Sequence, residues 1–264
     1  MVCEKPKARP TAMSSALRCL ATLELLAEAP FELTLADLAE RLEAPKPTAH
    51  RLCATLLDAG LIEQDPRTRR YRLAAKALWV GSGYLRHSAI YRAAFFPMQE
   101  LARRAPGTVQ LGVLQGDRVL FIHSVGYADA PHAFADVGLR RPLYATASGK
   151  VLLAAMPPAE AERMLAGRYE KFTEQTITTP ARMRRELDEV RRKQYARNIE
   201  ELLPGYWVLA GRVRGAGGAT LAAISLTLAI EHLEKGSEAR YAAMVKDACQ
   251  KASLQLGFRA GEAI

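Results

Sequence analysis

Apolar positions in the first quarter of the chain recur at helical spacing in three successive segments. The first segment covers residues 15–29 and stops at Pro30. The second, residues 34–42, opens with a Thr-x-x-Asp capping box at its first residue. The third starts with Pro47 in its first turn, continues to about residue 58 and ends before Gly60. Two short helices separated by a tight break are typical of a helix-turn-helix.

A β-hairpin is predicted directly after the third helix. Residues 61–63 and 71–73 are short and strand-like, and the turn between them is rich in arginine. A hairpin in this position is a wing. We therefore expect residues 14–75 to form a winged helix-turn-helix domain, preceded by a flexible arm at residues 1–13.

A long helical pattern at residues 76–105 indicates a linker helix after this domain. Gly81, Gly83 and Pro97 favour a bend or break within the linker helix. A Pro-Gly pair at residues 106–107 marks the start of the next domain.

The remainder of the chain, residues 106–264, mixes predicted strand pairs with helices. The hairpins are expected at residues 109–125 and 207–228, and the helices at residues 148–156, 158–165, 180–194 and 237–256. Antiparallel strand pairs combined with helices indicate an α+β domain, in which helices pack on an antiparallel sheet.

Composition fits a two-domain protein of the cytoplasm. With 264 residues, 49% of them hydrophobic, the chain can bury two modest cores. No apolar run approaches the roughly 20 residues of a membrane span, and the first residues lack the apolar segment of a signal peptide, so we expect a cytoplasmic location and no membrane partner. The four cysteines are scattered without a Cys-x-x-Cys pair, which favours free thiols.

The formal net charge of +9 suits a polyanionic partner but does not locate the contact. Residues 1–75 carry eleven Lys and Arg against ten Asp and Glu, so the positive excess lies in the rest of the chain. Local clustering is more informative, because residues 66–72 contain four arginines and no acid.

The third helix and the hairpin turn carry the residues expected to contact double-stranded DNA. A recognition helix presents polar and cationic side chains to bases and phosphates, while an opposite stripe, here Leu52, Leu56 and Leu57, packs inward. The alternative is that these charges form only a solvated face. The predicted DNA contacts are Lys46, Thr48, His50, Arg51, Thr55, Arg67, Arg69 and Arg70.

Several stretches of the chain resemble the IclR family of transcriptional regulators. They are residues 34–42 (TLADLAERL), residues 45–62 with the run PKPTAHRL, and residues 141–154 (RPLYATASGKVLLA), while residues 223–226 (AISL) are similar to the family's terminal strand. The resemblance implies a sequence-specific DNA-binding regulator with a GAF-like effector domain. It also implies homodimers formed through the N-terminal half and the linker helix, and often tetramers. We expect no catalytic residues and no cofactor. Pro47 and Asn198 depart from the family pattern.

The resemblance also implies where an effector binds. The N-terminus of the helix at residue 148 offers free backbone N–H groups to an anion, and the implied lid is the loop from Asp129 to Phe134. Since family members mostly sense catabolic acids, the favoured effector is an aromatic or short-chain carboxylate. Whether the protein activates or represses transcription stays open. The implied pocket residues are Ala147, Ser148, Gly149, Asn198, Tyr206, Val208, Ser225 and Thr227.

Local alternatives exist for several of these pocket positions. Ser225 and Thr227 alternate on a strand and could satisfy local hydrogen bonds, and Gly149 could serve packing. Parity alone does not decide whether Tyr206 or Trp207 faces the cavity.

Other function classes fit the sequence less well. The Gly-Lys pair at residues 149–150 lacks the earlier Gly and the Ser or Thr of a phosphate loop, and the glycines at 215–218 lie between two strands rather than before a helix, unlike a dinucleotide fingerprint. His123 and His132 with Asp129 or Asp136 are weak metal candidates, because lone histidines near strands are more often structural. The competing hypothesis is a ligand-independent protein whose C-terminal domain only assembles subunits.

Overall fold

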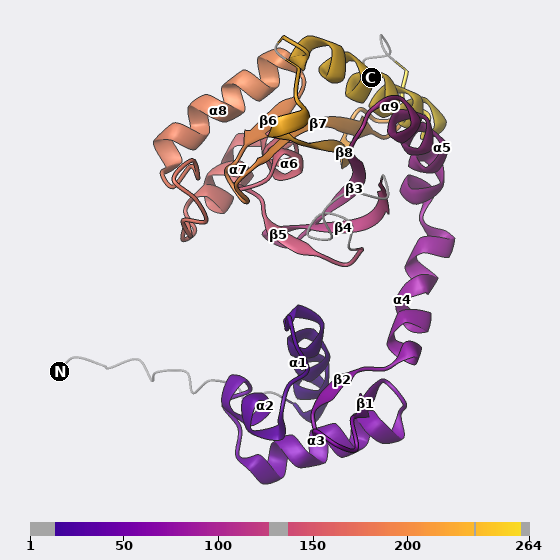
Figure 1. Ribbon diagram of the computed structural model, residues 1–264, viewed down its shortest axis with the longest axis vertical. Helices are drawn as coiled ribbons and strands as arrows, with labels where there is room; N and C mark the ends of the chain where they lie inside the picture. Colours follow the sequence, from indigo (N-terminus) through magenta and orange to yellow (C-terminus); the bar gives the residue numbers. More distant parts are fainter. Residues whose placement is uncertain (1–13, 127–136, 235, 260–264) are drawn as a thin grey trace, which may run out of the picture. The chain divides into compact units, whose positions relative to one another are not determined.

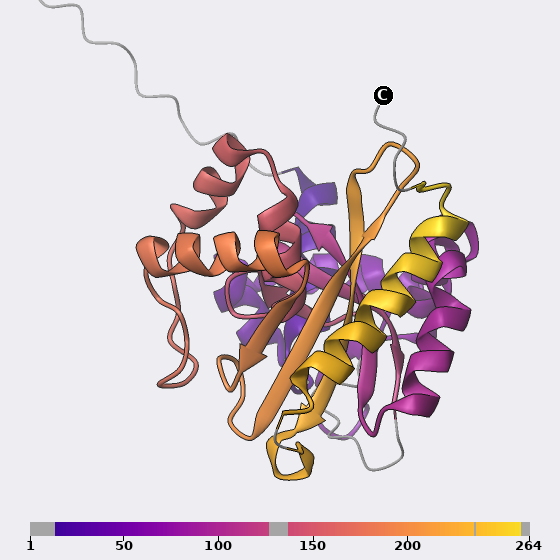
Figure 2. The same cartoon turned by 90° about the horizontal axis from the view of Figure 1, so that it is seen from above.

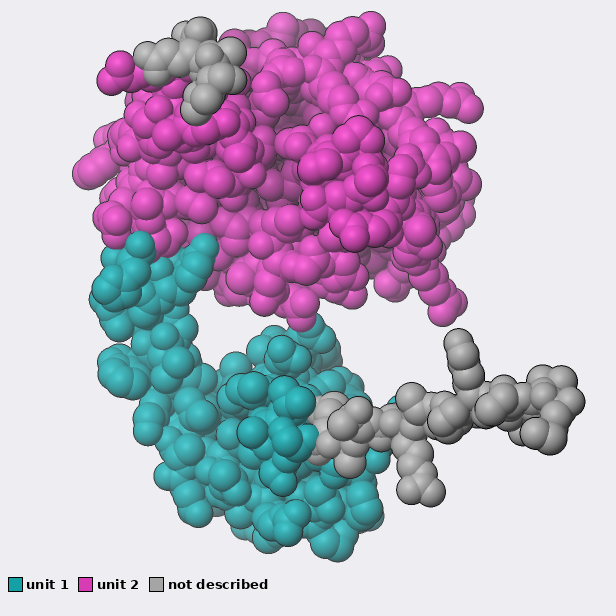
Figure 3. All heavy atoms as spheres, turned by 180° about the vertical axis from the view of Figure 1, so that it is seen from behind, with its two compact units in different colours: residues 1–87 teal, residues 88–264 magenta. Residues whose placement is uncertain are grey.

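The computed structural model describes residues 14–126, 137–234 and 236–259. The chain forms two compact units, Met1–His87 and Ser88–Ile264, which Figure 3 colours separately. The division between the units falls inside the predicted linker at residues 76–105.

The N-terminal unit has the predicted order of three helices, a hairpin and a further helix (Figure 1). The Thr34 hydroxyl accepts from the Asp37 N–H at 3.2 Å and the Asp37 carboxylate accepts from the Thr34 N–H at 2.8 Å, so the predicted capping box is confirmed. Its elements are α1 (Ser15–Glu28), α2 (Leu35–Arg41), α3 (Lys46–Asp58), β1 (Ile62–Gln64), β2 (Tyr71–Leu73) and α4 (Ala75–His87).

A small core joins the helices of this unit to the hairpin. Tyr71 of β2 exchanges backbone hydrogen bonds with Leu33, which fixes the hairpin against the segment before α2. Side chains from α1, α2, α3 and both strands together form one apolar cluster. Its buried members are Leu26, Leu33, Leu38, Cys53, Leu56, Ile62 and Tyr71.

The predicted linker consists of two helices, α4 and α5 (Ala89–Arg104), rather than one. The break lies at Ser88, whose hydroxyl caps α5 by accepting from the Tyr91 N–H at 3.1 Å. The expected break within the linker is therefore present at Ser88, whereas α4 continues through Gly81 and Gly83 and α5 continues through Pro97. The whole of α5 belongs to the C-terminal unit, where its apolar face packs on α9 and the sheet.

The C-terminal unit contains a six-stranded antiparallel sheet of order β5-β4-β3-β8-β7-β6, which confirms the expected α+β class. The predicted hairpins are β3 (Thr108–Gln115) with β4 (Arg118–Val125), and β7 (Tyr206–Arg214) with β8 (Thr220–Ala229). Two strands were not predicted, β5 (Arg140–Pro142) and β6 (Ala196–Ile199), because neither segment alternates apolar and polar residues.

Helices cover both faces of the sheet (Figures 1 and 2). One face carries α5 and α9 (Glu238–Gln255), and the other carries α6 (Ala147–Ala155), on which α7 (Pro158–Leu165) and α8 (Pro180–Lys193) pack. A short 3₁₀ turn, η2 (Ile230–His232), follows β8.

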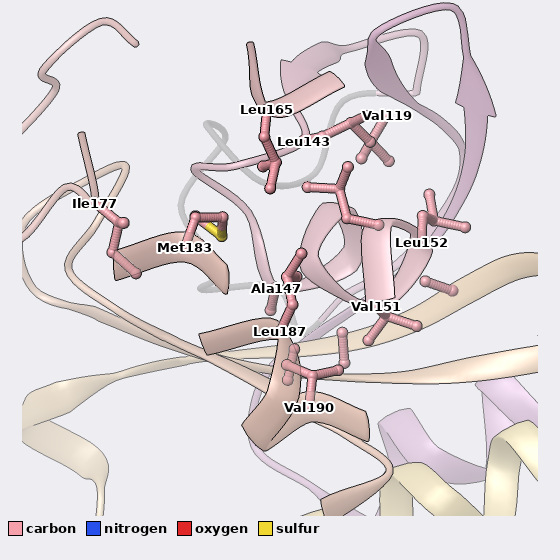
Figure 4. Packing of buried hydrophobic residues seen from close by; sticks show 14 of the residues in the cluster. Val119, Leu143, Ala147, Val151, Leu152, Leu165, Ile177, Met183, Leu187 and Val190 are labelled. Carbon is pink, nitrogen blue, oxygen red and sulfur yellow. The ribbon is translucent and has the colours of Figure 1, made fainter. Parts of the chain in front are cut away.

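The face covered by α6 holds an apolar cluster (Figure 4). Neighbouring residues of β7 face opposite layers, as a strand's period of two requires. Ala210 belongs to the α6 cluster, whereas a Cβ added at Gly211 would lie 2.8 Å from the sulfur of Cys249 in α9. Side chains from α6 and α8 meet directly in this cluster, including Val151, Met183, Leu187 and Val190.

Candidate functional site

The helix α3 has one buried and one exposed face, as a recognition helix requires. The buried face consists of Ala49, Leu52, Cys53 and Leu56, and Leu57 is half-buried against the same core. Thr48 is half-buried. The exposed predicted contacts on α3 are Lys46, His50, Arg51 and Thr55.

The tip of the β1–β2 wing is held by Asp65. Its Oδ1 accepts from the backbone N–H of Arg67 at 2.7 Å and of Thr68 at 2.8 Å, and these hydrogen bonds lower the pKa of the Asp65 carboxyl. Arg69 closes the turn in the left-handed region with φ of 58°, and its N–H donates to the Asp65 carbonyl at 2.9 Å. The turn therefore holds Arg67 and Arg69 on an exposed tip.

Two of the predicted DNA contacts already have partners within the unit. Arg70 donates from Nη1 to the Glu32 carbonyl at 2.9 Å, and the Thr55 hydroxyl donates to the Arg51 carbonyl at 3.0 Å. Arg72 pairs with Glu63 and Glu32 at 2.5 and 2.6 Å. Arg70 and Arg72 thus tie the wing to the segment before α2.

The remaining cations of this surface are available to an external anion. Among the residues that the structure describes, no carboxylate lies within 4 Å of the charged groups of Lys46, Arg51, Arg67 or Arg69. Exposed, unneutralised cations on a short helix and on a hairpin tip are the arrangement that phosphate contacts need.

A cavity in the C-terminal unit lies between the sheet and the start of α6. About 480 Å³ of space that protein atoms do not fill lies within it, including the part open to solvent. Seven of the eight predicted pocket residues line it: Ala147, Ser148, Asn198, Tyr206, Val208, Ser225 and Thr227.

The N-terminus of α6 forms one wall of this cavity. The Thr146 hydroxyl accepts from the Gly149 N–H at 3.0 Å, and Thr146, Ala147 and Ser148 all line the cavity. The N–H groups of Ala147 and Ser148 lie in the first helical turn, where α-helix geometry gives them no intrahelical acceptor. The helix dipole adds positive potential at the same place.

Gly149, the eighth predicted pocket residue, does not line the cavity. A Cβ added at this glycine would lie 2.1 Å from the Leu143 carbonyl oxygen and 2.4 Å from its Cα. The absence of a side chain therefore lets α6 pack directly on the backbone of Leu143, which is the packing alternative raised from the sequence.

Two buried polar groups on the cavity wall have no hydrogen-bond partner in the described chain. They are Nε2 of Gln110 and Oγ1 of Thr227, in side chains that are 3% and 5% exposed. Arg141, a half-buried cation, lines the same cavity. An unpartnered buried polar group costs about 1–3 kcal/mol, so a ligand or water that hydrogen-bonds to these two atoms would be favoured.

Asn198 holds the cavity wall together through both of its polar atoms. Its Nδ2 donates to the Ala145 carbonyl at 2.7 Å, and its Oδ1 accepts from the Glu201 N–H at 3.1 Å. Ala145 and Leu202, on either side of this bridge, also line the cavity. Asn198 therefore shapes the wall, and each polar atom of its amide has one partner.

A buried lysine joins the same two segments behind the wall. Lys150 is fully buried, and its Nζ donates to Glu201 at 2.6 Å, to Glu186 at 3.1 Å and to the Arg197 carbonyl at 3.0 Å. Burial raises the pKa of Glu201, against the opposing effect of the Lys150 charge. The Lys150 ammonium is thus a structural group rather than part of a phosphate loop.

The structure settles the orientation of Tyr206 and Trp207 and adds lining residues that were not predicted. Tyr206 lines the cavity, whereas the Trp207 ring packs on the Tyr241 ring of α9 with centroids 6.1 Å apart. Gln110 could have been predicted as a lining residue, because it is a polar residue within an otherwise apolar predicted strand. The further lining residues are Gln110, Phe121, Leu139, Arg141, Ala145, Thr146, Leu202 and Leu203.

The remaining site candidates either have structural surroundings or fall outside the description. His123 packs against Tyr91 and Phe95 of α5, with ring centroids 5.0 and 5.6 Å away, and burial lowers its pKa. The described residues contain no group of three His, Cys, Asp or Glu that could hold a metal ion. The predicted lid from Asp129 to Phe134, together with His132 and Asp136, lies outside the described residues.

The described helices include none that is long and apolar enough to cross a membrane. Three of the cysteines, Cys19, Cys53 and Cys249, are free thiols.

Comparisons with known proteins match both units of the chain. A family model described as "IclR helix-turn-helix domain" matches residues 15–66, and one described as "Bacterial transcriptional regulator IclR C-terminal" matches residues 82–254. The HTH-type transcriptional regulator KdgR of Escherichia coli (strain K12) is 31% identical over 251 residues, 95% of each chain.

The Glycerol operon regulatory protein of Streptomyces coelicolor is 35% identical over 242 residues, which cover 91% of this chain and 95% of that protein. Among solved structures, an IclR transcriptional regulator from Alicyclobacillus acidocaldarius superposes with a TM-score of 0.82 at 27% identity, covering 92% of this chain and 98% of the other.

Proposed function

We propose that this chain, which belongs to the IclR family of DNA-binding transcriptional regulators, contacts its operator through α3 and the wing under the control of a small carboxylate bound beside α6. Its domains and relatives are regulators and not enzymes. Three elements of this proposal go beyond family membership: the DNA contacts, the class of effector, and a homodimer that would read a two-part operator.

The proposed DNA contacts divide into two kinds. Arg51, His50 and Thr48 would read base edges from the first turns of α3, and Lys46 would contact a phosphate. Arg67 and Arg69 on the wing would contact phosphates of any sequence. Arg70 and Thr55 are the weaker candidates, because both already donate to carbonyl groups of the unit.

The observation that carries the effector proposal is the pair of unpartnered polar atoms, Gln110 Nε2 and Thr227 Oγ1, in a cavity that also contains a helix N-terminus. A carboxylate would accept from the free N–H groups of Ala147 and Ser148. The apolar side chains of the wall, including Phe121 and Val208, would enclose an aromatic ring or a short carbon chain.

A thermal-shift series with aromatic and short-chain carboxylates tests the effector proposal. An effector present at 100 times its dissociation constant should stabilise the native protein by about 2.7 kcal/mol. Thr227→Val should reduce this response to roughly 0.3–1.3 kcal/mol at the same effector concentration. It should leave the unliganded protein as stable or up to about 1 kcal/mol more stable, because the hydroxyl that it deletes has no partner in the described chain.

Thr176→Val is the matched control for this substitution. The Thr176 hydroxyl is buried, donates to the Glu201 carbonyl at 2.7 Å and does not line the cavity. Its loss should destabilise the protein by about 1–3 kcal/mol and leave the response to the effector intact. A Thr227→Val variant that behaves like this control, or a protein that responds to no acid, would favour a C-terminal unit that only assembles subunits.

Control of DNA binding by the effector requires a reciprocal effect. If the carboxylate changes the affinity for a DNA duplex by some factor, that duplex must change the affinity for the carboxylate by the same factor. Measuring both affinities by titration tests the coupling and shows whether the effector strengthens or weakens DNA binding.

A further inference from the structure

A second hollow in the C-terminal unit lies between the end of β7 and the last turns of α9, two elements that run beside each other in Figure 2. About 920 Å³ of atom-free space lies within this groove, including the part open to solvent. The groove shares no lining residue with the effector cavity. Its walls are Gln194, Gly211, Arg212, Arg214, Lys246, Cys249, Gln250, Ser253, Leu254 and Phe258.

The groove carries three cations and no acidic side chain. The cations are Arg212, Arg214 and Lys246, and none of them forms an ion pair within the described part of the chain. Neighbouring cations on the same helices are neutralised: Lys251 of α9 contacts Glu100 and Asp247 at 2.8 and 2.9 Å, and Arg191 of α8 contacts Asp188 at 2.8 Å. The groove is therefore a site of uncompensated positive charge.

Aromatic rings and hydrogen bonds hold these cations in place. The Arg214 guanidinium lies over the Phe258 ring, 3.7 Å from its centroid, and the Arg214 backbone N–H donates to Ser253 Oγ at 2.9 Å. Lys246 Nζ lies 5.0 Å from the centroid of the Tyr195 ring. Arg212 donates to the side-chain oxygen of Gln194.

Arg214 also lacks a partner for one of its donors. Its Nε is buried and has no hydrogen-bond partner in the described chain. Burial and, secondly, the charge of Arg212 lower the pKa of Arg214. An anion bound between the two guanidinium groups would neutralise both and could accept from the unpartnered donor.

We propose that this groove is a second small-molecule site, separate from the effector cavity, which binds an organic anion with two or more negative charges. Di- and tricarboxylates and phosphate monoesters share this chemistry. Leu254 and Phe258 supply an apolar wall for the carbon skeleton of such a ligand.

Isothermal titration calorimetry with tricarballylate and glycerol 3-phosphate as probes tests this assignment and separates the two ligand sources. At least one probe should bind the native protein at low ionic strength, and its affinity should fall as NaCl is added. In the double variant Arg212→Gln/Arg214→Gln the affinity should fall about tenfold or more, because two charge-assisted contacts are lost. Lys251→Gln, which removes a neutralised cation of the same helix, should leave the affinity unchanged.

A milder variant guards against misfolding of the double variant. Lys246 is exposed, so Lys246→Gln should keep the native circular dichroism spectrum and still weaken the probe that binds. If neither probe binds the native protein at low ionic strength, or if all the groove variants bind as tightly as Lys251→Gln, the groove is not a site for small anions.

Discussion

Replacing Gly149 with alanine should lower the free energy of unfolding of the C-terminal unit, although alanine is the better helix former. The added Cβ would lie 2.1, 2.4 and 2.6 Å from the O, Cα and C atoms of Leu143. Ordinary contacts of this kind exceed about 3.4 Å, so one of the two backbone segments must move by more than about 1 Å.

The backbone around Leu143 has little freedom to move. The Leu143 side chain is buried, the Pro142 carbonyl accepts from the Thr146 hydroxyl at 3.2 Å, and the Ala145 carbonyl accepts from Asn198 at 2.7 Å. Overpacking of this kind costs about 3 kcal/mol, against a gain of about 1 kcal/mol from helix propensity. The net destabilisation should be about 2 kcal/mol.

Urea unfolding followed by tryptophan fluorescence measures this effect. Trp207 is 3% exposed in the C-terminal unit and Trp79 is 64% exposed in the N-terminal unit, so the change in emission reports mainly on the C-terminal unit. With a slope of about 2 kcal/mol per molar urea, the Gly149→Ala midpoint should fall by about 1 M.

Gly81→Ala is the control for Gly149→Ala. Gly81 lies in α4, and apart from its chain neighbours and the backbone of its own helix, no described heavy atom would lie within 4 Å of its added Cβ. Circular dichroism should therefore show no destabilisation and up to about 1 kcal/mol of gain. A Gly149→Ala midpoint equal to or above that of the native protein would refute the packing argument.

Three further predictions concern the wing, the buried lysine and the capping box. Arg69→Gly should stabilise the N-terminal unit by roughly 0.5–1 kcal/mol, because glycine adopts the left-handed backbone conformation at this position without strain. The same variant should weaken binding to every DNA sequence. A lower urea midpoint for the N-terminal unit would contradict the predicted stabilisation. Lys150→Met should destabilise the C-terminal unit by about 3–5 kcal/mol, because it leaves the buried Glu201 carboxylate without its cation. Adding Glu201→Gln should recover part of the loss in a double-mutant cycle. Hydrogen bonds from Thr34 lower the pKa of Asp37 from its ordinary 3.8, so its contribution to stability is complete above pH 3.8 and is lost as pH falls through the folded-state pKa; Asp37→Asn should flatten the stability profile in that range.

Features of the sequence with a strong local cause could be predicted. The capping box at Thr34, the Gly60 stop and the Arg-rich turn each act within a few residues, and they place α2, α3 and the wing correctly. The break of the linker at Ser88 also has a local cause, a serine cap, but the glycines and the proline nearby gave a competing signal.

Features that depend on long-range contacts could not be predicted. Arg70 looked like a free cation until folding brought it to the Glu32 carbonyl, 38 residues away. Gln110 and Arg141 lie on different strands, and only the sheet order brings them to the same cavity. Gly149 lies within residues 141–154, which resemble the family, and the sequence does not show that the Leu143 backbone approaches it.

The salt dependence of DNA binding tests the central claim most directly, namely that α3 and the wing present free cations to duplex DNA. A DNA duplex selected from a random library would be titrated at several salt concentrations with the native protein and with the wing variant Arg67→Ala/Arg69→Ala. The control is Arg182→Ala/Arg185→Ala, which removes the same charge from exposed positions of α8. Each phosphate contact contributes about 0.9 to the slope of log K against log salt. The account predicts a slope smaller by about 1–2 for the wing variant alone; equal slopes and affinities in all three proteins would contradict it.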